Sequence, residues 1–195
     1  MAGSGAVRIV AGNLLFVVCC ISYLAWWLLA FRPTNPVTGM RSDWLFIPAF
    51  ATGIAGIVFI VWGMSTGPAT RRLFPAWWAV VGAIVGFIVI LALTWWLFDR
   101  PLTSELFLIV GWTALVLAEL SALYGTGSLS HPLVWAFIAI VTIVFLICLV
   151  CYVLYFKLDP TWSFYDGMVP LILTALVMAA ISVAMLVSAP VVAGR

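Results

Sequence analysis

A single acidic residue interrupts one of the long apolar segments of this chain. Glu119 lies within residues 106–124, which carry no other charge. In the hydrocarbon region of a bilayer, a carboxyl group has to face other helices, pair with a polar group or hold a proton. Two interpretations therefore stay open. Either Glu119 belongs to a solute or proton site on a central path, or it is a protonated residue hydrogen-bonded between helices or reaching toward a nearby interface.

Polar and aromatic residues in three apolar segments are candidates for lining such a path. Tyr124 shares the segment of Glu119 but is not well aligned with it on a helix. Asp166 opens the last apolar segment, where it either caps a helix N-terminus or stands at the mouth of a pore. The full set of pathway candidates is Glu119, Trp112, Thr113, Tyr124, Asp166 and Asn13.

Residues that could perform other chemistry are scarce. The one histidine, His131, and the one lysine, Lys157, both lie at predicted membrane boundaries, and a metal or haem site needs more ligands than these. Cysteines occur at positions 19, 20, 148 and 151, all in apolar surroundings that suit core packing better than redox activity. We therefore expect no catalytic residue, no cofactor and no metal, and we do not expect an enzyme.

The composition explains why these few residues matter. Of 195 residues, 7% are charged and 67% are hydrophobic, whereas an ordinary soluble domain is about 25% charged. This balance excludes a soluble enzyme, a nucleic-acid binder and a disordered chain, and the net charge of +2 is too small to indicate a polyanionic partner. The lipid bilayer is the expected surrounding, and no nucleic acid is expected as a partner.

The charged residues divide the chain into apolar runs long enough to cross a membrane. A spanning helix needs about 20 apolar residues, and the runs do not alternate as the strands of a membrane barrel do. We predict an all-α, polytopic integral membrane protein, with one transmembrane domain over residues 1–195 and no extramembrane domain. The six predicted helices lie near residues 9–31, 44–63, 76–98, 105–124, 132–156 and 167–189.

Prolines, tryptophans and basic residues bear on the ends of these spans and on their orientation. Pro48 and Pro170 fall in the predicted first turns, and ten of the 11 tryptophans fall near span ends. Interfacial anchoring accounts for that distribution more simply than an aromatic ligand cage does. Lysine and arginine number four on each side, so their count does not fix the orientation. We place both termini in the cytoplasm of a multi-pass protein of the plasma (inner) membrane.

Three helical hairpins are suggested by an internal repeat. Residues 26–33 and 95–101 both read Trp-Trp-Leu, then Phe, then Arg-Pro, and residues 155–160 give a looser version. Independent convergence of helix ends is the alternative explanation. Small residues spaced for close helix contact in lipid occur as Ala49/Gly53, Thr52/Gly56, Gly82/Gly86, Ala175/Ala179 and Ala180/Ala184. Such contacts form either within one chain or between copies.

Two short segments resemble the AmiS/UreI family of urea and short-amide channels. Gly67-Pro68-Ala69-Thr70 precedes the third span as a similar tetrapeptide does in some members, and Trp162 followed by Asp166-Gly167 is similar to a motif before their last helix. The resemblance implies three two-helix hairpins around a narrow aromatic-lined pore and assembly into hexameric rings. The histidine-rich loops of acid-gated members are missing, so acid gating is not implied.

These features lead to two functional expectations of different classes. The first is a membrane channel or transporter for a small neutral or weakly acidic solute, assembled as a homo-oligomer. The second is a non-catalytic membrane subunit or scaffold whose partners belong to a larger membrane complex. An intramembrane enzyme is the weakest alternative, because acid–base partners for Glu119 are missing from the sequence.

Overall fold

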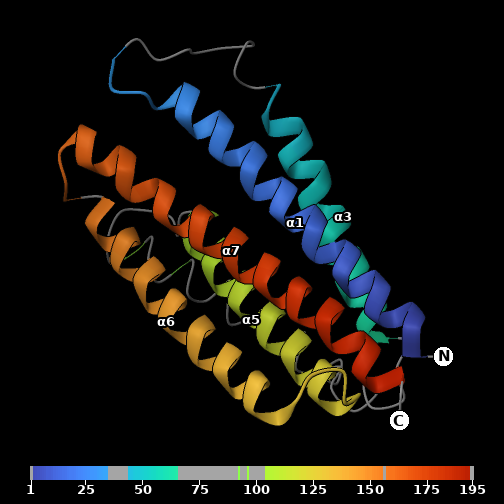
Figure 1. Ribbon diagram of the computed structural model, residues 1–195. Helices are drawn as coiled ribbons and strands as arrows, with labels where there is room; N and C mark the ends of the chain where they lie inside the picture. Colours follow the sequence, from blue (N-terminus) through green and yellow to red (C-terminus); the bar gives the residue numbers. More distant parts are fainter. Residues whose placement is uncertain are drawn as a thin grey trace.

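Long helices make up the part of the chain that the computed structural model describes, which is residues 2–34, 44–65, 92, 96, 104–155 and 157–193. The helices are α1 (Ala2–Ala30), α3 (Phe46–Ser65), α5 (Ser104–Gly125), α6 (His131–Tyr155) and α7 (Pro160–Ala193) (Figure 1). Each contains a stretch long and apolar enough to cross a membrane, and no strand occurs in these ranges. The predicted all-helical class is confirmed for them, and the five helices are compatible with a multi-pass membrane protein.

One predicted span has no counterpart in this description. The third span, residues 76–98, and its Gly82/Gly86 pair lie outside the described residues, apart from positions 92 and 96. The repeat between residues 26–33 and 95–101 therefore stays a prediction, as does the total of six spans. The tetrapeptide at residues 67–70 also lies outside the described residues.

The helices form an antiparallel bundle with both termini at one end (Figure 1). α1 packs between α3 and α7, and α6 packs between α7 and α5. α1 and α6 run toward the end where α6 joins α7, whereas α5 and α7 run toward the termini. Two opposite ends can therefore be defined, which we name the terminal end and the α6–α7 end.

The start of α7 differs from the prediction. The Ser163 backbone N–H donates to the Asp159 carbonyl at 2.9 Å, so Asp159 caps the helix and Pro160 takes its first position. The predicted start at residue 167 is therefore wrong. Asp166 does not open the helix but lies six residues after Pro160, and Pro170 lies ten residues after Pro160 rather than in the first turn.

Small residues let α1 and α3 approach closely. A methyl group added to Gly12 would lie 2.6 Å from Ile60 Cγ1 and 2.8 Å from the Gly56 carbonyl oxygen. One added to Gly63 would lie 2.8 Å from the carbonyl oxygen of Gly5. Backbone therefore faces backbone along this contact, which we name the glycine seam. The small residues of α3 thus meet α1 of the same chain.

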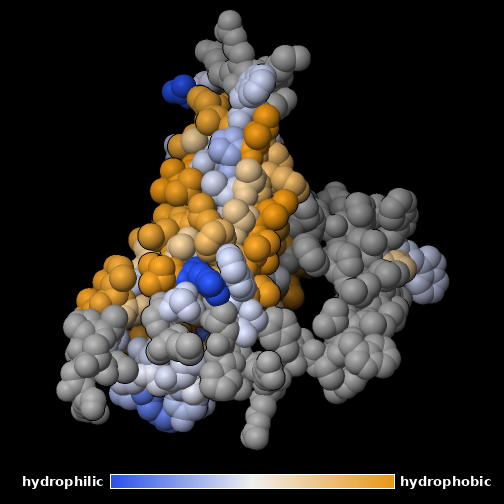
Figure 2. All heavy atoms as spheres, turned by 90° about the vertical axis from the view of Figure 1, so that its right-hand side faces the viewer, coloured by the Kyte–Doolittle hydropathy of each residue, from blue (hydrophilic) through white to orange (hydrophobic). Residues whose placement is uncertain are grey.

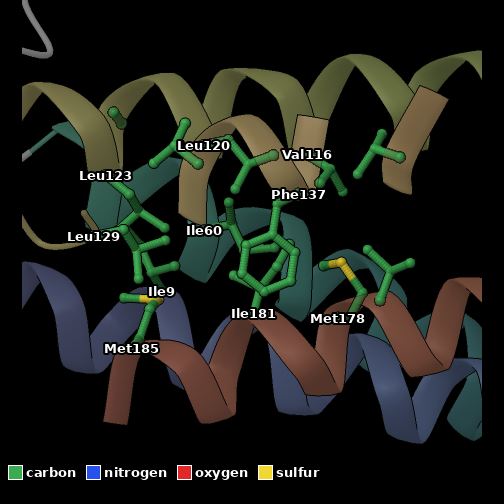
Figure 3. Close-up of a cluster of buried hydrophobic side chains, with 14 of the residues drawn as sticks. Ile9, Ile60, Val116, Leu120, Leu123, Leu129, Phe137, Met178, Ile181 and Met185 are labelled. Atoms are coloured by element: carbon green, nitrogen blue, oxygen red, sulfur yellow. The ribbon is translucent and has the colours of Figure 1, made fainter. Parts of the chain in front are cut away.

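Apolar side chains from every described helix fill the interior, as Figure 3 shows. Outward-facing residues are also apolar: Leu14 on α1, Ile143 on α6 and Leu186 on α7 are each at least 50% exposed. Figure 2 shows a hydrophobic band that lies between more polar ends. An apolar interior inside an apolar exterior is what a bundle surrounded by lipid requires.

The tryptophans divide into two groups. Trp44, Trp62, Trp135 and Trp162 lie near helix ends and are exposed, as an interfacial belt requires. Trp27 is buried instead, and its indole N–H donates to the Phe164 carbonyl of α7 at 3.0 Å. A methyl group on Gly167 would overlap the same indole. Trp27 therefore fastens α1 to α7 rather than anchoring the chain at the interface.

Candidate functional site

Two of the predicted pathway residues, far apart in the sequence, meet in the interior. The Asn13 side-chain amide Nδ2 donates to Glu119 Oε1 at 2.7 Å, linking α1 to α5. Both side chains are fully buried. Glu119 is thus hydrogen-bonded between two helices, as the second interpretation expected. Its membership of a solute or proton site stays a prediction.

Each member of this polar pair keeps one oxygen without a partner. Asn13 Oδ1 and Glu119 Oε2 are buried and accept no hydrogen bond from the described residues. Buried polar atoms are nearly always hydrogen-bonded, because an unsatisfied one costs about 1–3 kcal/mol. Two such atoms on side chains that are hydrogen-bonded to each other identify the Asn13–Glu119 pair as the leading candidate for a binding site.

The pair lies at an apolar level of the bundle. Val116 and Leu120 flank Glu119 on α5 and are fully buried. Ser182 on α7 is also buried, but its hydroxyl donates to the Met178 carbonyl of its own helix at 2.9 Å. The cation of Arg8 lies on Trp62 of α3, 4.0 Å from the ring centroid. An ionised Glu119 would thus be costly here, and a protonated one makes the pair neutral.

Trp112 shares the buried face of α5 with Glu119. It lies seven residues earlier, which is two helical turns or about 10 Å, and its indole Nε1 has no hydrogen-bond partner among the described residues. Thr113 is half-buried, and its hydroxyl donates to the Ile109 carbonyl at 2.8 Å. Trp112 therefore offers a donor to the interior, whereas the Thr113 proton is used within α5.

Tyr124 lies away from Glu119. Its side chain is 51% exposed, and its ring packs edge-on against His131 with the centroids 5.4 Å apart. These two residues, together with Ser121 and Trp135, border a shallow groove of about 170 Å³ between α5 and α6. The structure does not bring Tyr124 to the polar pair, since its aromatic ring belongs to the outer surface.

Asp166 forms a second polar point, closer to the α6–α7 end. Its carboxylate interacts with the thiol of Cys151 on α6, and Asp166 Oδ2 is buried without a hydrogen-bond partner among the described residues. Because Pro170 has no N–H, the Asp166 carbonyl also lacks its helical hydrogen-bond donor. Sequence reasoning identified Asp166 but missed Cys151, which it assigned to core packing alone.

Metal ligands do not gather in the described ranges. No three His, Cys, Asp or Glu side chains lie close enough there to hold an ion. The four cysteines are free thiols, of which Cys19 lies in the glycine seam with its Sγ 3.0 Å from where a methyl group on Gly53 would be.

Comparisons with protein-family models, with curated proteins and with solved structures find no match to this chain. The resemblance to the AmiS/UreI family therefore stays a prediction that rests on the two short sequence segments.

Proposed function

We propose that the chain is a membrane channel or transporter for a small neutral or weakly acidic solute and that the Asn13–Glu119 pair is its central binding site. The observation that carries the proposal is the pair of unpartnered oxygens, Asn13 Oδ1 and Glu119 Oε2, deep in an apolar bundle. A purely structural hydrogen bond gives no reason to leave both of them unsatisfied.

The chemistry of the pair favours a particular kind of solute. When Glu119 holds a proton on Oε2, this O–H is a donor, and the unpartnered Asn13 Oδ1 is an acceptor. An amide, a urea or a carboxylic acid presents the complementary carbonyl and N–H or O–H side by side. Such a solute satisfies both groups without bringing a charge into the membrane.

The wider proposal keeps the architecture expected from the sequence. Residues 76–98 supply a sixth span, the chain consists of three hairpins in the plasma (inner) membrane with both termini cytoplasmic, and copies of it associate. The five apolar helices and the common end of the two termini support an even number of crossings. An even number of spans places both termini on the same side.

A non-catalytic subunit of a membrane complex is the second candidate. It is favoured by the closely packed apolar side chains around Glu119, such as Leu120 and Val116, since a scaffold needs no path. In that case the Asn13–Glu119 hydrogen bond only holds α1 against α5. The two candidates differ in whether the purified chain moves a solute.

A solute-flux measurement separates them. We expect proteoliposomes of the wild-type chain to equilibrate urea or acetamide at least about tenfold faster than protein-free vesicles do. A tenfold difference corresponds to about 1.4 kcal/mol, within the range of one satisfied pair of hydrogen bonds. Glycerol has a similar size but no carbonyl group and serves as the matched control. If neither carbonyl solute moves faster than in empty vesicles, the subunit proposal replaces the channel.

A further inference from the structure

We propose that the Asn13–Glu119 pair is reached from the α6–α7 end, by a route on which Asp166 and Trp112 are additional binding residues, and that apolar side chains close the terminal end. This inference rests on the proposed function. It assigns a direction of access and two hydrogen-bonding positions between the membrane surface and the pair.

The polar atoms without partners follow the long axis of the bundle. Gly167 lies against Trp27, so Asp166 stands level with Trp27 on α1. From Trp27 to Asn13 is 14 residues, or about 21 Å of helix. Trp112 precedes Glu119 by about 10 Å on α5. Because α5 runs opposite to α1, Trp112 lies on the α6–α7 side of the pair, about midway between the pair and Asp166.

These three positions offer complementary chemistry. Asp166 Oδ2 is an acceptor, Trp112 Nε1 is a donor, and the Asn13–Glu119 pair provides both when Glu119 is protonated. Trp26 Nε1 also lacks a partner, but its ring packs against Phe46 of α3, 5.2 Å between centroids, and so it lies off this line. A solute that moves along this line meets a hydrogen-bonding position about every 10 Å.

The α6–α7 end has the features of an entrance. Asp166 lies only six residues, or about 9 Å, inside the start of α7. The connection beyond it carries the exposed polar residues Lys157 and Asp159. Pro170 has no N–H to donate to the Asp166 carbonyl, so this carbonyl lacks its usual helical hydrogen bond.

The terminal end is filled by apolar side chains, as Figure 3 shows. Toward the termini from the pair, Leu123 and Leu129 meet Ile9 and Met185, and each of them is at most 5% exposed. A polar solute that had reached the pair would have to displace these four apolar side chains to move on toward the terminal end. Among the described residues, the unpartnered buried side-chain atoms lie at the pair and toward the α6–α7 end, so only that side offers further hydrogen-bonding positions to a solute.

A thiol on the proposed route provides the test without any knowledge of the solute. Cys151 interacts with Asp166, whereas Cys19 is less buried but lies in the glycine seam, off the route. Chains that keep one of these cysteines, with the other three changed to alanine, are reconstituted and treated with 2-aminoethyl methanethiosulfonate. A thiol scavenger is trapped on the far side of the membrane. We expect Cys151 to react at least about tenfold faster than Cys19.

Reference cysteines give the side of access. Lys157→Cys marks the α6–α7 end and Ser130→Cys marks the terminal end. Cys151 is expected to react from the same side as Lys157→Cys, and Asp166→Asn is expected to slow the cationic reagent more than the neutral 2-hydroxyethyl reagent. Equal reaction of Cys151 and Cys19, or reaction from the side of Ser130→Cys, overturns the inference. Labelling as expected without urea or acetamide flux upholds the route and refutes the proposed function alone.

Discussion

Gly12→Ala is expected to destabilise the protein by about 1–3 kcal/mol, the range found for forcing extra volume into a closely packed interior. The new methyl group would lie 2.6 Å from Ile60 Cγ1 and 2.8 Å from both the Ile60 nitrogen and the Gly56 carbonyl oxygen. Because two of these three atoms belong to the backbone of α3, a change of rotamer cannot relieve the overlap. The two helices have to separate along the glycine seam.

Gly111→Ala is the matched control, because a methyl group at Gly111 on α5 meets nothing within 4 Å. That change is expected to be neutral or stabilising by up to about 1 kcal/mol, since alanine favours helix more than glycine does. Unfolding of both variants by sodium dodecyl sulfate in mixed micelles, followed by tryptophan fluorescence, measures the difference. Equal free energies of unfolding for the two variants would mean that α1 and α3 do not pack as described.

The second large effect is expected at the polar pair. Asn13→Leu and Glu119→Leu each leave a buried polar partner unsatisfied, so each is expected to lower the free energy of unfolding by about 1–3 kcal/mol. The double variant Asn13→Leu/Glu119→Leu removes both polar groups. Its loss in the free energy of unfolding is expected to be smaller than the sum of the two single losses. The expected coupling is about 1–2 kcal/mol, near the upper values for hydrogen bonds between membrane helices.

The same unfolding titration on the four chains gives this coupling directly. Glu119→Gln serves as the conservative control, because its amide oxygen still accepts from Asn13 Nδ2 at the position of Oε1. We expect Glu119→Gln to stay within about 1 kcal/mol of wild type, since the hydrogen bond is kept. Additive effects of the two leucine changes would show that Asn13 and Glu119 do not interact in the folded protein.

Gly12 and Asn13 show how the fold and the site are connected. Successive residues on a helix point about 100° apart, so Gly12 faces α3 while Asn13 faces α5. The glycine seam brings α3 directly against α1, and Trp27 fastens the same helix to α7. α1 is thereby held on two sides, which fixes the position from which Asn13 reaches Glu119.

The sequence predicted the described helices because charge is so scarce. The runs of apolar residues between charged ones locate α3, α5 and α6 and the end of α1 to within two residues, as a spanning helix in lipid requires. α1 begins at Ala2, seven residues before the predicted start, because the helix continues past Arg8. The start of α7 could not be placed in the same way. Asp159 caps it, and residues 161–166 are then polar or aromatic residues within the helix, which hydropathy alone does not distinguish from a loop.

The candidate site was predicted in its members but not in its contacts. Glu119 and Asn13 stood out because each is polar in an apolar segment, but nothing in one sequence indicates that residues 106 positions apart share a hydrogen bond. Tyr124 was included because it shares the segment of Glu119, and it lies on the outer surface because helical geometry turns it away from Glu119. Cys151 was overlooked because a cysteine in an apolar run normally serves as a core residue.

The double variant Asn13→Leu/Glu119→Leu tests whether solute passes through the Asn13–Glu119 pair. Its fold is expected to be retained, because both polar partners are removed together. We expect urea and acetamide flux in proteoliposomes of the folded double variant to fall to the level of protein-free vesicles, while wild type remains at least about tenfold faster. Wild-type flux in the folded double variant would instead show that the solute crosses without the pair.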